Sequence, residues 1–186
     1  MRCSTVGKDG SVCVWKDEPD NQVIVSKDGK VVQTIGRKGG RALLGAWQPG
    51  GLRFVQSMAV DAAGKLWIAE ADGVPKRMSA WDLASGKLVR EFFGPTTYGA
   101  LGGAICPTDA NVMIGQGCEW RLDPQTGLAR ITAVITRDGM ENSRFATGAN
   151  GKTYLAVASG WIGDAKPVKI FERLAEADYK LRCVFR

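Results

Sequence analysis

The chain has 186 residues, of which 45% are hydrophobic, 24 are glycine and none is histidine. This length fits one domain or at most two small ones, and no apolar run approaches the ~18 residues of a membrane-spanning helix. The lack of histidine excludes His-dependent catalytic triads, His-ligated zinc and histidine general bases within this chain. The first residues also lack the charged and apolar regions of a signal peptide.

The net charge is modestly positive, with 25 Lys and Arg against 19 Asp and Glu, or +6. The densest basic group is Arg37, Lys38 and Arg41, in a Gly-rich stretch. Such a group can meet phosphates or an acidic surface. A nucleic-acid-binding domain normally has a denser basic stripe and a recognisable motif, so we do not expect a nucleic-acid partner.

The first segment, residues 2–36, alternates short β-prone runs with tight turns. The runs are 2–6, 11–15, 22–26 and 30–35, and the turns include Asp9-Gly10 and Asp28-Gly29. Short runs rich in β-branched and aromatic residues between Gly turns predict an antiparallel meander. Residues 37–55 follow as a long linker.

The second segment, residues 56–94, has the clearest pattern. Its predicted strands are 57–61, 65–69, 77–82 and 87–93, and Gly64 and Gly86 mark two of the turns. The same pattern returns in residues 101–135 and 143–185, where Thr126-Gly127 and Asn150-Gly151 mark turns.

Superposing these segments aligns Trp81-Asp82 with Leu122-Asp123 and Phe171-Glu172, each followed by a turn and a return strand. Four repeats of four strands predict an all-β fold, a β-propeller of four-stranded antiparallel blades with about four blades in this chain. We expect residues 1–186 to form a single propeller or part of one.

Residues 58–70, MAVDAAGKLWIAE, resemble the opening run of an NHL repeat, and residues 78–87 resemble its continuing run. The resemblance is good over residues 57–94, partial over 7–36 and weak in the last two repeats. Residues 75–95 are also similar to large bacterial NHL-containing proteins, and this similarity implies an extracytoplasmic location.

NHL propellers usually close with about six blades. The chain is therefore either part of a larger propeller, with further blades outside it, or an independent four-bladed ring. In such a ring, a Cys3–Cys183 disulfide would join the first strand to the last, as in hemopexin-like propellers. Such a bridge needs an oxidising compartment.

The resemblance also implies an enzymatic alternative, because NHL-like folds host lactonase-like hydrolases and an amidating lyase. The lack of histidine counts against the lyase. A calcium site could be built from the carboxylates of Asp61, Glu70, Asp72 and Glu119, and Glu70 and Asp72 end an inner strand. The alternative function is thus a calcium-dependent propeller hydrolase or lyase.

The favoured function is a non-catalytic scaffold that binds a protein, peptide or carbohydrate through its loops, with no cofactor. Two loop tryptophans, Trp47 and Trp161, are candidate anchors for such a partner. The predicted contact residues are Arg37, Lys38, Arg41, Trp47 and Trp161.

Overall fold

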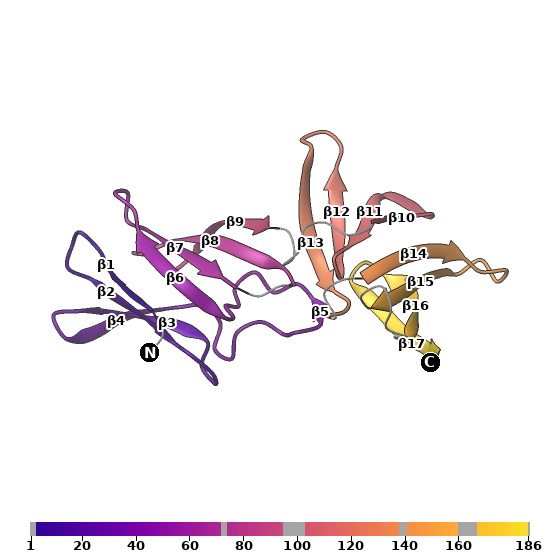
Figure 1. The fold of residues 1–186 in the computed structure, drawn as a ribbon. Helices are drawn as coiled ribbons and strands as arrows, with labels where there is room; N and C mark the ends of the chain where they lie inside the picture. The colour runs from indigo at the N-terminus through magenta and orange to yellow at the C-terminus, as the bar shows by residue number, and fades with distance from the viewer. Residues whose placement is uncertain (1–2, 72–73, 95–102, 138–140, 160–166, 186) are drawn as a thin grey trace. The chain divides into compact units, whose positions relative to one another are not determined.

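A computed structural model describes residues 3–71, 74–94, 103–137, 141–159 and 167–185. These residues form β-structure and no helix, and the strands are arranged in four antiparallel sheets (Figure 1). In the part of the chain that is described, no helix is long and apolar enough to cross a membrane.

The first two sheets are meanders of four strands each, in which every strand pairs with the next one along the chain. The first contains β1 (Ser4–Val6), β2 (Val12–Lys16), β3 (Gln22–Lys27) and β4 (Lys30–Ile35). The second contains β6 (Val55–Val60), β7 (Lys65–Glu70), β8 (Lys76–Asp82) and β9 (Leu88–Gly94).

The third and fourth sheets repeat the same topology. The third contains β10 (Ala104–Cys106), β11 (Asp109–Gly115), β12 (Cys118–Asp123) and β13 (Leu128–Val134). The fourth contains β14 (Glu141–Thr147), β15 (Thr153–Ser159), β16 (Val168–Ala175) and β17 (Asp178–Phe185). Four sequential four-stranded antiparallel sheets confirm the predicted all-β fold class of propeller blades.

The chain divides into two compact units. The first holds the sheets β1–β4 and β6–β9, and its core is built from alternate residues of their strands. In β2, β3 and β7 every second side chain is buried, as period-2 alternation requires for a strand with one buried face. The core of this unit consists of Cys13, Trp15, Val23, Val25, Ile35, Leu52, Val55, Leu66, Ile68 and Trp81.

The second unit holds the other two sheets and has its own apolar core. That core consists of Ile114, Ala133, Ile135, Leu155 and Val157. Phe145 and Phe171 pack against it from the fourth sheet.

One strand was not predicted from the sequence. Within the linker, β5 (Gly45–Ala46) pairs antiparallel with the outer strand β13 and makes the third sheet five-stranded. The backbone N–H of Trp47 continues this pairing by donating to the carbonyl of Thr132 over 2.8 Å. The sequence did not indicate this strand, because a Gly-Ala pair carries no strand pattern.

The turn between the first two strands has one geometry in three of the sheets. In Gly7–Ser11, Asp61–Lys65 and Gly148–Lys152, the N–H of the first residue donates to the carbonyl of the fifth. The fourth residue is always a glycine that donates back to the first and has a φ between 75° and 82°. A positive φ favours glycine, so these glycines mark the repeat in the sequence.

All five cysteines are free thiols, including Cys3 and Cys183. Cys3 lies at the edge of the first unit's core, and Cys183 lies exposed on β17.

Candidate functional site

The linker begins with a tight loop that presents two basic side chains. Arg37 and Lys38 are exposed, and neither forms an ion pair with any described residue. The backbone of the loop is held by hydrogen bonds from the N–H of Arg37 to the carbonyl of Gly50 (2.7 Å) and from that of Gly39 to the carbonyl of Asp20 (2.7 Å). Two exposed cations thus project from a fixed backbone.

Beneath this loop lies a buried ion network centred on Glu70, at the end of β7. Arg41 pairs with one carboxylate oxygen of Glu70, and Arg77 of β8 pairs with the other at 3.1 Å. Arg77 also donates to the backbone carbonyls of Gly51 (2.9 Å) and Pro49. The side chains of Arg41, Glu70 and Arg77 have at most 2% of their surface exposed. The network therefore ties the linker backbone to the second sheet.

Two further charged groups complete the network. The backbone N–H of Arg53 donates to Glu70 over 2.7 Å, and the Arg53 side chain donates to the carbonyl of Arg41 over 3.1 Å. Glu91 of β9 lies 2.9 Å from the Arg77 guanidinium. Burial lowers the pKa of Arg77, while Glu70 and Glu91 act in the opposite direction.

The two arms of the linker, residues 40–41 and 51–52, pack closely against each other through their backbones. A Cβ on Gly51 would lie under 3.0 Å from the backbone of Arg41, and one on Gly40 would lie under 3.0 Å from the carbonyl of Leu52. Only glycine permits these approaches without a shift of the backbone. Leu52 itself is fully buried in the core of the first unit.

The predicted contact residues separate into different environments. Arg37 and Lys38 are exposed as expected, whereas Arg41 is buried and pairs with Glu70. Trp47 is half-buried in the second unit, and Trp161 lies outside the described residues. Arg41 is therefore not accessible to a partner.

Three of the four candidate calcium ligands, Asp61, Glu70 and Glu119, already have partners within the protein. Both oxygens of Glu70 accept from arginines and one also accepts from the N–H of Arg53. Asp61 accepts from the amides of its own turn and from the indole N–H of Trp67. Asp72 lies outside the described residues. Among those that are described, no three His, Cys, Asp or Glu side chains are grouped to hold a metal ion.

In the second unit, Glu119 is the centre of a second buried network. One of its oxygens accepts from Thr132 (2.6 Å) and from the N–H of Ala177 (2.9 Å), and the other accepts from Arg173 (2.9 Å) and Tyr179. Burial alone would raise the pKa of Glu119, but these hydrogen bonds outweigh it and the pKa lies below its ordinary value. Burial and the bond to Glu119 raise the pKa of Tyr179. Glu119 thus joins the third sheet to the fourth.

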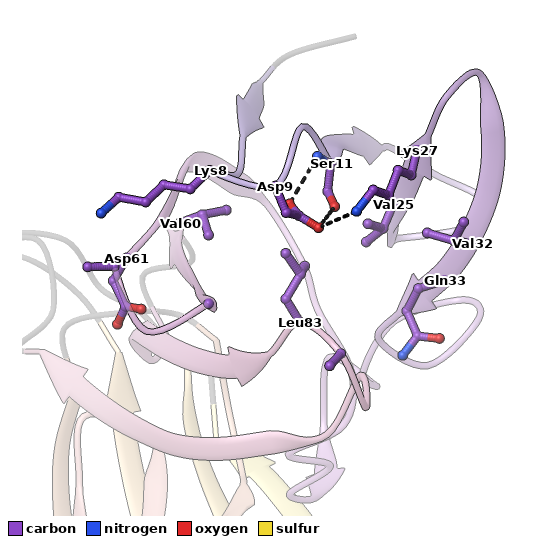
Figure 2. Close-up of a pocket in the computed structure, with 13 residues that line it drawn as sticks. Lys8, Asp9, Ser11, Val25, Lys27, Val32, Gln33, Val60, Asp61 and Leu83 are labelled. Carbon is purple, nitrogen blue, oxygen red and sulfur yellow. Dashed lines mark hydrogen bonds and ion pairs between the residues drawn. The ribbon is translucent and has the colours of Figure 1, made fainter.

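A cleft of about 490 Å³ opens between the two sheets of the first unit (Figure 2). It is formed by the β1–β2 turn, strands β3 and β4, and the turns that follow β6 and β8. Its apolar lining includes Val25, Val32, Val60 and Leu83, and its polar lining includes Lys8, Asp9, Ser11, Lys27, Gln33 and Asp61. A cleft of this size accommodates a small molecule.

Sequence reasoning missed Arg77 and Arg53 as parts of the Glu70 network, and it missed the cleft. One signal was present for the network. Leu66, Ile68 and Glu70 share one face of β7, and the first two belong to the core, so Glu70 had to be buried with compensating charge. Its partners lie up to 29 residues away in the chain, and no local pattern connects them.

No protein-family model matches the chain, and no curated protein matches it in sequence. Several solved structures are similar to it at low identity. Hydrazine synthase from Kuenenia stuttgartiensis is 15% identical over 96% of this chain and 52% of that chain, with a TM-score of 0.39. A protein of unknown function from Bacteroides caccae is 13% identical over 96% and 58%, with a TM-score of 0.35. The Pan2 WD40 domain of Neurospora crassa is 10% identical over 97% and 52%, with a TM-score of 0.32.

The chain therefore spans about half the length of the hydrazine synthase chain that it matches. The class of the protein, all-β with propeller-type blades, follows from the topology of its own four sheets.

Proposed function

We propose that this chain is a non-catalytic scaffold of NHL-like blades that binds a partner through its loops. The exposed part of the linker, Arg37 and Lys38, is the contact surface, and an acidic protein or peptide segment is the partner. The repeated turn of Gly7–Ser11, Asp61–Lys65 and Gly148–Lys152 supports the assignment to NHL-like blades.

The anchoring of the linker is the observation that carries this proposal. A loop that is already fixed loses little conformational entropy when it binds, and this makes association more favourable. Here the buried Arg41–Glu70–Arg77 network fixes the backbone, while the side chains of Arg37 and Lys38 are exposed and form no ion pair with a described residue. Two adjacent cations on a rigid loop are complementary to a pair of carboxylates.

A titration with fluorescently labelled hexaglutamate at low ionic strength tests the proposal, with maltohexaose as a neutral carbohydrate probe. We expect saturable binding of hexaglutamate that weakens with salt, and a loss of affinity of at least about tenfold in the double variant Arg37→Glu/Lys38→Glu.

The matched control is Lys30→Glu/Lys87→Glu, which changes the net charge equally at two exposed positions elsewhere in the first unit. Retained binding in the control with lost binding in the loop variant supports the surface. An equal loss of hexaglutamate affinity in both variants means non-specific electrostatic attraction and rejects Arg37 and Lys38 as the contact surface. Binding of maltohexaose without hexaglutamate replaces the acidic partner with a carbohydrate, and Trp47→Ala then tests that tryptophan as the stacking residue.

A further inference from the structure

The cleft of the first unit differs from the linker surface, and the hydrogen bonds of its polar groups indicate what it would bind. Its two carboxylates already accept hydrogen bonds from their own turns and from neighbouring strands. Asp9 accepts from the backbone N–H of Ser11 (3.1 Å), from its hydroxyl (2.7 Å) and from Lys27 (3.2 Å). Asp61 accepts from the N–H groups of Ala63 and Lys65, both at 2.9 Å.

The indole N–H of Trp67 donates to the second oxygen of Asp61 over 2.9 Å. Hydrogen bonds from Ser11, with a smaller contribution from Lys27, lower the pKa of Asp9 to about 2. Both carboxylates are therefore ionised at neutral pH, and the turns themselves supply most of their donors. They have little capacity left for a cationic ligand.

In contrast to the carboxylates, the lysine ammonium groups of the cleft have unused hydrogen-bond donors. A lysine ammonium carries three donors and no acceptor. Lys27 uses one donor on Asp9, and Lys8 forms no hydrogen bond or ion pair within the described structure. Figure 2 shows Lys8 reaching along the side of the cleft that holds Val60 and Asp61, whereas Lys27 lies at the other side. The unused hydrogen-bond donors of the cleft are thus suited to an anion.

The cleft also has apolar lining residues beside its polar ones. Val25 belongs to the buried core, Val60 and Leu83 pack against that core, and Val32 is exposed. An apolar group placed on these side chains would remove hydrocarbon from water, which is the main source of affinity in small-molecule sites.

We propose that this cleft binds a small carboxylate with an apolar body. The body lies on Val60 and Leu83, and the carboxylate accepts hydrogen bonds from the ammonium of Lys8. The site is independent of the linker surface, because Arg37 and Lys38 are not among its lining residues.

The probe is 4-phenylbutanoate, titrated to about 20 mM into ¹⁵N-labelled protein and followed by the amide resonances of Ser11, Gln33, Gly64 and Ala84. We expect saturable shifts with a dissociation constant in the millimolar range, as for other ligands of this size. Two comparison probes separate the contributions of the charge and of the apolar body to the affinity. The alcohol 4-phenylbutan-1-ol keeps the apolar body without the charge, and acetate keeps the charge without the body. We expect each of them to bind at least about fivefold more weakly.

The variant Lys8→Gln should weaken 4-phenylbutanoate about fivefold while leaving the alcohol unchanged, because only the carboxylate uses the ammonium. Lys30→Gln is the control, since it removes the same charge from an exposed position that does not line the cleft. The spectra themselves report whether each variant is folded.

The proposal is overturned if 4-phenylbutanoate causes no saturable shifts at these amides. It is also overturned if the alcohol binds as tightly as the acid, or if Lys8→Gln and Lys30→Gln have the same effect. None of these results bears on hexaglutamate binding at Arg37 and Lys38.

Discussion

At the scale of single residues, the first unit depends on Glu70, a carboxylate that accepts from two buried guanidinium groups and a backbone N–H. Removing one partner of a buried ion network leaves the remaining charges without compensation. We expect Glu70→Gln to lower the free energy of unfolding by about 3–5 kcal/mol, measured by urea denaturation.

Glu18→Gln is the matched control, because Glu18 also pairs with an arginine, Arg53, but its side chain is 66% exposed. We expect Glu18→Gln to lower the free energy of unfolding by less than about 1 kcal/mol. A similar decrease in the free energy of unfolding in Glu70→Gln and Glu18→Gln would contradict the central role of Glu70.

The same contacts give an expectation for calcium. A calcium ion at Glu70 would have to displace Arg41 and Arg77 from the carboxylate, and two nearby guanidinium groups repel a divalent cation. We therefore expect 5 mM calcium to leave the melting temperature unchanged relative to 5 mM magnesium. A calcium-specific rise would favour the alternative function, a calcium-dependent hydrolase, since a ligand that binds only the folded state raises its stability.

Two adjacent glycines make a sharp comparison of local packing. Gly51→Ala places a methyl group against the backbone of Arg41, whereas a Cβ on Gly50 would have no atom within 4 Å. We expect Gly51→Ala to destabilise the protein by about 1–3 kcal/mol and Gly50→Ala to be neutral or slightly stabilising, again by urea denaturation. Equal effects would show that the arms of the linker do not pack as described.

At the scale of elements, the β8–β9 and β12–β13 turns share a design. Asp82 accepts from the N–H and hydroxyl of Ser85, and Asp123 accepts in the same way from Thr126. Such Asx-type turns fix a hairpin by satisfying its free amides.

We expect Asp123→Ala to lower the melting temperature, because it removes the acceptor for the N–H groups of Gln125 and Thr126. Gln125→Ala is the control, since it alters an exposed side chain in the same turn and keeps that acceptor. A melting temperature that falls equally in both variants would mean that the hydrogen bonds of the turn are not responsible.

These turns also explain why the strands could be predicted from the sequence. Gly64, Gly86, Gly127 and Gly151 all have a positive φ, which glycine adopts without strain, so their spacing records where each hairpin reverses. The strand β5 could not be found in this way, because its pairing depends on Ala133 and Val134, almost ninety residues further along the chain.

The candidate site was less predictable than the fold for a similar reason. A local cluster of basic residues indicates exposure, and this holds for Arg37 and Lys38. Arg41 is buried because Glu70 needs a partner, and that requirement arises only when β7 packs in the core.

At the scale of the whole molecule, the carboxyl groups of both units determine how the free energy of unfolding depends on pH in acid. Hydrogen bonds from neighbouring N–H and O–H groups and from basic side chains lower the pKa of a set of carboxyl groups: Asp9, Asp20, Asp61, Asp82, Asp109, Glu119, Asp123, Glu172 and Glu176. The unfolded chain therefore binds more protons than the folded chain as the pH falls through this range.

The stability that these groups contribute is fully present above their unfolded pKa values, about 4. It is lost as the pH falls through the lower folded values, of which that of Asp9 is about 2. We expect the free energy of unfolding to decrease steadily from about pH 4.5 to pH 2. Urea denaturation at pH 7, 5, 4, 3 and 2 measures this dependence, and a constant or rising stability between pH 5 and pH 3 would contradict it.

The anchoring of the linker also has a consequence for protein engineering. Arg77 holds residues 49 and 51 through their main-chain carbonyls, so the identity of the side chain at position 49 does not enter this contact. The side chains at positions 37 and 38 are exposed and form no ion pair with a described residue. A display library randomised at these two positions, with Arg41, Gly51, Glu70 and Arg77 kept, would therefore vary the binding specificity of the loop on a constant framework.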